Sequence, residues 1–202
     1  MIEISDYQID VLKELMNIGV GRSIAALHDL VQSHIVMEVP RVEVLSVEEA
    51  SERLHALGLT SVSIINLHFD GPFSGVSSLY FPTPEADKFV SLLDARAAES
   101  GEGIELLRSG ILMEIGNIVL NSVMGTFGNT LGKHFSFSVP DYFECSGDEI
   151  LSSRPAKTSI VLLSLCNFHV EDSHVDGFIN LIFDIESLHS LLAAVDEAST
   201  GL

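Results

Sequence analysis

The chain repeats itself at an offset of 100 residues, and this repeat restricts the possible fold more than any other feature. Residues 10–40 align with residues 110–140 without a gap. Seven of the 31 aligned positions are identical, where average composition would give about two. The identical pairs are Leu12/Leu112, Glu14/Glu114, Asn17/Asn117, Ile18/Ile118, His34/His134, Val39/Val139 and Pro40/Pro140. Two copies are too few for a solenoid, so we expect one compact domain with internal pseudo-symmetry.

Each half has the same order of expected elements: a long helix, three strands and a shorter helix. Apolar residues at helical spacing predict long helices from Ser5 to about Gln32 and over about 104–131. Alternating or continuous apolar runs predict strands over 35–39, 62–69, 75–81, 135–145, 159–169 and 175–183. Further helices are expected over 84–93 and 186–195, and a short one that opens with the capping box Ser46/Glu49.

These elements predict an α+β fold, an α/β sandwich in which the two long helices pack on one face of a shared six-stranded sheet. The fold would be a pseudo-symmetric duplication of a helix–three-strand–helix unit. Repeat 1 would cover about residues 1–99 and repeat 2 about 103–202 of a single domain, 1–202. The stretch from Glu99 to Gly103 is the one linker-like join between them.

The charge of the chain excludes several classes of partner. Ten Lys and Arg residues stand against 29 Asp and Glu residues, a net charge of −19. Nucleic-acid binding needs a basic surface, and anionic membranes repel an acidic one, so we expect neither partner.

The first residues lack the basic and apolar regions of a signal peptide, and the sequence predicts no membrane span. Cys145 and Cys166 form no CxxC pair and are interpreted as reduced core thiols rather than a disulfide or redox pair, so a cytoplasmic protein is expected.

The repeated polar element is Glu-x-x-Asn, then a spacer, then Pro. It occurs as Glu14, Asn17 and Pro40, and again as Glu114, Asn117 and Pro140, with 22 residues between the Asn and the Pro in each copy. Residues three apart share one face of a helix, and the apolar stripe lies mostly elsewhere, so this face should be exposed. The prolines fall in expected strands, which favours an edge strand or a bulge and a structural role.

Local propensity indicates that this face serves something other than helix stability. An Asn inside a helix costs roughly 0.5–0.7 kcal/mol relative to Ala, and a Gly about 1 kcal/mol. The two long helices nevertheless contain Gly19, Gly21, Gly116 and Gly125 besides the two Asn residues. Violations of local rules mark candidate functional positions. The glycines have a plainer interpretation as well, namely that they let the two long helices approach closely.

The pattern Asp10-x3-Glu14-x2-Asn17-x22-Pro40 resembles the signature of the CheC-type chemotaxis phosphatases, the group of CheC, CheX and FliY. The segments Glu14–Gly21 and Glu114–Ile118 are similar to the two helix motifs of that family. The resemblance covers essentially the whole chain, and the presence of two motifs is closer to CheC than to CheX.

The resemblance implies dephosphorylation of the aspartyl phosphate in a CheY-type receiver domain, in chemotaxis or two-component signalling. Asn17 and Asn117 would orient an attacking water in line with the phosphorus, and Glu14 and Glu114 would pair with the active-site lysine of the receiver. Asp10, Gly21 and Asn121 are assigned to partner binding. The protein would need no cofactor of its own, because the receiver supplies Mg²⁺.

One departure and one rival interpretation accompany this hypothesis. The family pattern has Asp or Ser four residues before the Glu, where the second half has Gly110. The rival is a non-catalytic module that sequesters a phosphorylated receiver, acts in a flagellar-type switch or binds a CheD-type deamidase. An ordinary hydrolase with its own nucleophile has little support, because no nucleophile elbow is present.

The eight histidines do not form a metal-binding pattern, since none occurs in HExxH or with Cys at zinc spacing. We expect no metal site of the protein's own. His34 and His134 are interpreted as structural.

Overall fold

The computed structural model describes residues 4–31, 35–94, 103–150, 160–170 and 173–200. The helices are α1 (Asp6–Val31), α2 (Val47–His55), α3 (Thr83–Leu93), α4 (Ile104–Leu131) and α5 (Ile185–Thr200), with a 3₁₀ turn η2 (Gly147–Glu149). The strands are β1 (Ile35–Ser46), β2 (Ser61–Asp70), β3 (Gly75–Pro82), β4 (Ser136–Phe137), β5 (Asp141–Ser146), β6 (Ile160–Val170) and β7 (Ser173–Phe183).

All strands join one antiparallel sheet in the order β1-β6-β7-β3-β2, with β4 and β5 both on the free side of β2. Strands β1, β2 and β3 of the first half correspond to β5, β6 and β7 of the second. When each strand is replaced by its counterpart, the same strand order is obtained in the reverse direction. The strand order therefore has the pseudo-symmetry that the sequence predicts. The predicted join between the repeats lies outside the described residues except for Gly103, so the repeat boundaries stay a prediction.

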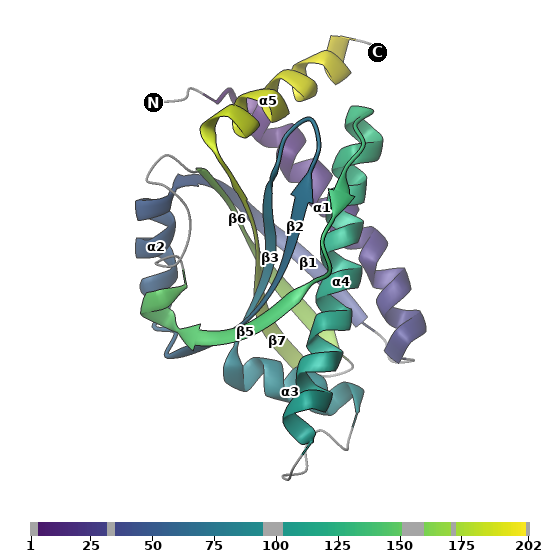
Figure 1. Ribbon diagram of the computed structural model, residues 1–202, viewed down its shortest axis with the longest axis vertical. Helices are drawn as coiled ribbons and strands as arrows, with labels where there is room; N and C mark the ends of the chain where they lie inside the picture. Colours follow the sequence, from purple (N-terminus) through teal and green to yellow (C-terminus); the bar gives the residue numbers. More distant parts are fainter. Residues whose placement is uncertain (1–3, 32–34, 95–102, 151–159, 171–172, 201–202) are drawn as a thin grey trace.

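The two long helices cover one face of the sheet, as predicted. Helices α1 and α4 pack against each other, α1 against β1, and α4 against β2 and β3 (Figure 1). Side chains from α1, α4 and the inner strands form the larger hydrophobic core. A smaller core, with Ala50, Leu54 and Tyr80, lies between α2 and the opposite face. The α1/α4 layer therefore has one side on the sheet and one side in solvent.

Local sequence signals account for the helix ends. Ser5 and Gln8 exchange hydrogen bonds of 3.0 and 3.2 Å at the start of α1, the capping box that their spacing indicates. Helix α4 begins after Gly103 and ends before Gly132, whose φ angles of 93° and 62° favour glycine. Helix α3 begins one residue before the predicted range of 84–93: Pro82 is the N-cap, and the Thr83 hydroxyl lies 2.9 Å from that of Ser61.

The two motif prolines lie at matching irregularities of the two outer strands. Along β1, Glu38 to Arg41 spans one residue more than the facing stretch of β6, which places Pro40 in a bulge. Phe137 to Asp141 likewise spans one residue more than the facing stretch of β2. Pro140 lies in this stretch and has no N–H for the ladder, so the single strand predicted over 135–145 is divided into β4 and β5.

Helix α4 has the length and apolar composition of a membrane span, and half of its most apolar stretch is buried inside the protein. No other helix within the described ranges passes this test. Its packing against α1 and the sheet explains the composition, because a core helix needs apolar residues on most of its surface.

Candidate functional site

The first Glu-x-x-Asn pair lies on the solvent side of α1. Glu14 is exposed and Asn17 is partly exposed, whereas the intervening Leu15 and Met16 are buried in the larger core. Because side chains three apart project from the same face of a helix, burial of Leu15 and Met16 directs the pair outward. The predicted exposure of this pair is confirmed.

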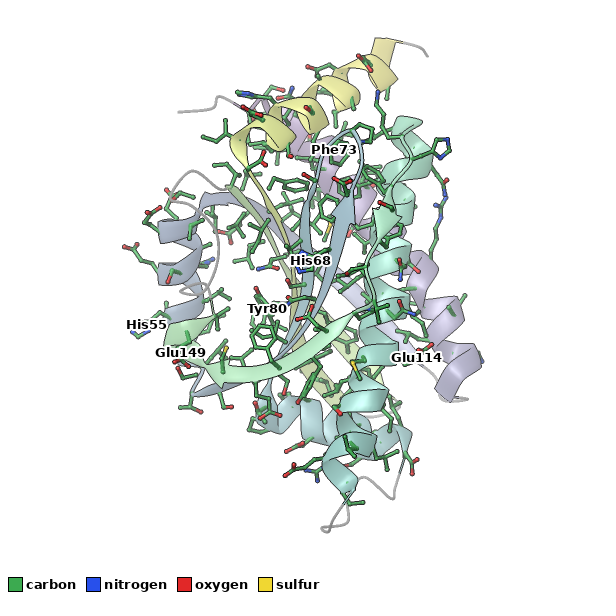
Figure 2. The ribbon with its side chains drawn as sticks, in the orientation of Figure 1. His55, His68, Phe73, Tyr80, Glu114 and Glu149 are labelled. Atoms are coloured by element: carbon green, nitrogen blue, oxygen red, sulfur yellow. The ribbon has the colours of Figure 1, made fainter. Side chains whose placement is uncertain are left out.

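The second pair has the same arrangement on α4. Glu114 is exposed and Asn117 partly exposed, and Figure 2 shows Glu114 on the side of α4 away from the sheet. Between them, Ile115 and Gly116 are buried. A Cβ on Gly116 would lie 2.4 Å from a methyl group of Ile65 on β2. Gly116 thus lets α4 lie directly on the sheet and turns the polar pair toward solvent.

The glycines of the long helices do not share one role. A Cβ on Gly19 would lie 2.6 Å from the Cα of Val123, so Gly19 permits the close contact of α1 with α4. Gly116 packs on the sheet instead, and a Cβ on Gly21 or Gly125 would meet no atom within 4 Å. The expectation that these glycines bring the two helices together therefore holds for Gly19 and is wrong for the other three.

Asn121 holds the side chain of Asn117. Its Nδ2 lies 2.8 Å from the backbone oxygen of Asn117 and 2.7 Å from the Asn117 Oδ1. A backbone carbonyl only accepts hydrogen bonds, so the Asn121 atom facing it must be the NH₂ group. The Asn117 atom that receives the second bond must then be its oxygen. The Asn117 NH₂ group is thereby turned away from Asn121.

The corresponding position on α1 is Gly21, which is exposed and has no side chain to hold Asn17. The residues one turn before each Glu differ as well: Asp10 on α1 is exposed, and Gly110 on α4 is exposed. The structure therefore places Asp10 next to the first pair and Asn121 next to the second. The two sites share their Glu and Asn residues and differ in the neighbours of these residues.

In the part of the chain that the structure describes, the side chains of Glu14 and Glu114 form no ion pair and no hydrogen bond. Arg22, an exposed cation two turns beyond Glu14, donates instead to the Thr126 hydroxyl at 3.1 Å and links α1 to α4. An exposed carboxylate without a partner in its own chain can accept a cation from another molecule. Each pair thus combines an anionic acceptor with a neutral amide.

The described residues contain no group of three or more His, Cys, Asp or Glu side chains placed to hold a metal ion. His134 is exposed, and Cys145 is partly buried and forms no disulfide within the described residues. His34 and the side chain of Cys166 lie outside the described part. The chemistry available at the two pairs is therefore that of carboxylate and amide groups.

Comparison with known proteins identifies the family. The model of the CheC-like family matches residues 8–44, which contain the first motif through Pro40. The CheY-P phosphatase CheC of Bacillus subtilis is 30% identical over 142 residues, 68% of this chain and 66% of that protein. The chain belongs to the CheC-like family.

Solved structures of other proteins have the same fold. FliY of Thermotoga maritima superposes with a TM-score of 0.75 at 14% identity and covers 98% of this chain and 100% of its own. CheX in the CheX–CheY–BeF₃–Mg²⁺ complex from Borrelia burgdorferi has a TM-score of 0.53 at 17% identity, with 85% of this chain and 97% of that one covered. The predicted fold class is confirmed.

Sequence reasoning did not find the contact between Asn121 and Asn117. A signal for it was present, because two Asn residues four apart on one helix face are neighbours. It also did not find a hollow beside Glu114, which α3 and α4 form together. No local pattern indicates such a hollow, since its walls come from two separate helices.

Proposed function

We propose that this protein is a cytoplasmic phosphatase that hydrolyses the aspartyl phosphate of a CheY-type receiver domain. The observation that carries the proposal is the same outward-facing Glu/Asn pair on both long helices. The B. subtilis relative is named a CheY-P phosphatase, and a protein of this fold is in complex with CheY. Both facts support a receiver as the partner.

The reaction transfers the phosphoryl group from the receiver aspartate to water. The bond between phosphorus and the carboxylate oxygen breaks, a bond to the water oxygen forms, and the products are a free carboxylate and inorganic phosphate. Because the transition state is loose, the catalyst mainly positions the water in line and helps to disperse charge. A neutral amide suits this task because it both donates and accepts hydrogen bonds and does not titrate.

In this proposal Asn17 and Asn117 orient the water inside the receiver site. The Asn117 Oδ1 accepts one hydrogen bond from Asn121 and has a second lone pair for a water hydrogen, while its NH₂ group is free to donate to a phosphoryl oxygen. Glu14 and Glu114 pair with the lysine of the receiver and so dock the helix. The receiver supplies Mg²⁺, and the protein contributes no metal of its own.

The test is phosphate release from a phosphorylated CheY-type receiver with and without the protein. Replacing both Asn17 and Asn117 by Ala should slow the accelerated release at least ~100-fold, about 2.7 kcal/mol of barrier, and binding should persist. Asn129→Ala is the matched control, because Asn129 is exposed on α4 outside the motif. An unchanged decay rate with the wild-type protein, across several cognate receivers, would refute the proposal.

A binding module without catalytic activity makes a different prediction for the same assay. It would form a complex with the phosphorylated receiver and leave the decay rate unchanged. A CheD-type deamidase as a second partner rests on the family resemblance alone, and a binding measurement with that protein tests it separately.

A further inference from the structure

A hollow of about 360 Å³ opens beside Glu114, between the end of α3 and the first half of α4. Its wall is apolar, formed by Leu93, Leu106, Leu107 and Ile111. Leu106 has 79% of its surface exposed, the second largest value among the exposed large apolar residues. Apolar surface of this kind beside a polar site is typical of a place where another molecule binds.

Gly110 keeps the hollow open toward solvent. It lines the hollow one helical turn before Glu114, and a Cβ at this position would meet no atom within 4 Å. A side chain could therefore occupy this space without displacing the core. Gly110, the position at which this chain departs from the family pattern, thus leaves the apolar wall beside Glu114 accessible.

The corresponding region of the first half has more charged and polar groups. Helix α5 packs against α1 as α3 packs against α4. At the positions that match Leu106, Leu107 and Gly110, α1 has Asp6, Tyr7 and Asp10, all exposed. Gln8 of α1 also donates to Asp196 of α5 at 3.1 Å, which joins the two helices by a polar contact. The two sites therefore offer different surroundings to a partner.

From this difference, and resting on the proposed function, we infer that the hollow receives an aliphatic or aromatic side chain of the receiver. The two charged residues that line the hollow, Asp94 and Glu114, are both acidic. Glu114, whose side chain has no partner among the described residues, favours an occupant in which a cation lies next to an apolar group. Glu114 belongs both to the hollow and to the proposed docking pair. A receiver whose lysine reaches Glu114 therefore places its neighbouring surface over the hollow.

The inference makes the second site a two-point docking site, with one ion pair and one buried apolar side chain. It predicts that the apolar contact affects binding of the receiver and leaves the chemical step unchanged, because no lining residue other than Glu114 belongs to the Glu/Asn pair. Binding energy from a contact remote from the reacting atoms raises affinity equally in the ground and transition states.

The experiment measures the affinity of a CheY-type receiver loaded with BeF₃⁻ and Mg²⁺ by titration calorimetry. The parent is Glu14→Lys, which disables the first site by charge reversal and leaves the second. Leu106→Ser removes part of the apolar wall, and Gly110→Leu fills the hollow. Leu57→Ser is the control, because Leu57 is an exposed leucine between α2 and β2 and does not line the hollow.

We expect Leu106→Ser and Gly110→Leu each to raise Kd at least fivefold over the parent, with kcat within twofold. Leu57→Ser should change Kd by less than twofold, and circular dichroism should show that all variants are folded. If the parent binds and both test variants bind equally well, the inference is refuted and the proposed function is not. If the parent and the wild type do not bind, both are refuted. Sedimentation tests whether the hollow instead binds a second copy of the chain. If the test variants lose self-association while their Kd for the receiver is unchanged, the inference is overturned.

Discussion

The Nδ2 of Asn121 lies 2.7 Å from the Oδ1 of Asn117, so the amide of the second Glu/Asn pair is held in one orientation. Because the same Nδ2 also donates to the Asn117 backbone at 2.8 Å, the contact is anchored to the helix itself. Gly21 occupies the matching place on α1, and Asn17 therefore lacks this support from its own helix. The two sites should differ in how well their amides are positioned.

Removal of Asn121 should lower the rate at the second site. In an Asn17→Ala background, Asn121→Ala should reduce kcat about tenfold, ~1.4 kcal/mol of barrier, with KM unchanged. Asn121→Asp should be equally harmful, because a carboxylate cannot donate the hydrogen bond. Phosphate-release kinetics with Asn129→Ala as the control give the measurement. An increase in KM at constant kcat would instead assign Asn121 to docking.

The converse substitution should improve the first site. In an Asn117→Ala background, Gly21→Asn places an amide four residues after Asn17, where a new Cβ meets no atom within 4 Å. We expect kcat to rise about threefold relative to the parent, ~0.7 kcal/mol of barrier. Gly21→Ala is the control, because it gains helix stability without the amide. Equal kinetics for the Ala and Asn variants would contradict the positioning role.

The helix contact at Gly19 should be sensitive to a single methyl group. Gly19→Ala should destabilise the protein by about 1–3 kcal/mol, because overpacking forces neighbouring atoms to move. The Val123 Cα would be only 2.6 Å from the new Cβ. The paired variant Gly21→Ala should stabilise the protein by roughly 0.5–1 kcal/mol through helix propensity. Equilibrium urea unfolding measures both, and a gain in stability for Gly19→Ala would contradict the close contact.

The start of α2 should make stability depend on pH in the acidic range. Hydrogen bonds from the Ser46 backbone and then from its side chain lower the pKa of Glu49 from its usual value. The ionised form is therefore favoured in the folded state. This contribution is present above the pKa of the unfolded chain and is lost as the pH falls through the folded pKa. The stability difference between wild type and Glu49→Gln, followed by urea unfolding from neutral to acidic pH, should shrink as the pH falls.

The duplication, the start of α1 and the surface position of the motif could all be predicted from sequence. The duplication is visible as a self-match at an offset of 100 residues, whereas the Ser5/Gln8 spacing and the apolar residues flanking each Glu/Asn pair are local signals. Such signals act within one or two helical turns, so they persist whatever the rest of the chain does. The extent of α4 was predicted correctly for the same reason.

The division of the last edge strand could not be predicted, although Pro140 was identified as a bulge candidate. The alternation along 135–145 fits one strand. The division into β4 and β5 appears only in the pairing with β2, where the stretch facing Phe137 to Asp141 is one residue shorter. Register describes which residues of two paired strands face each other, so the sequence of one strand does not specify it. The differing roles of Gly19, Gly116 and Gly21 have the same origin, since each depends on the neighbour that tertiary packing brings near.

The sequence by itself determined which residue types the two sites contain and that they face solvent, because helical periodicity separates polar from apolar side chains along one segment. Only the tertiary structure decided how the two sites differ. The approach of α3 to α4 creates a hollow beside Glu114, whereas the matching approach of α5 to α1 places the polar contact between Gln8 and Asp196 near the start of α1. Contacts between distant segments depend on the complete fold, so two nearly equal motifs acquired unequal surroundings.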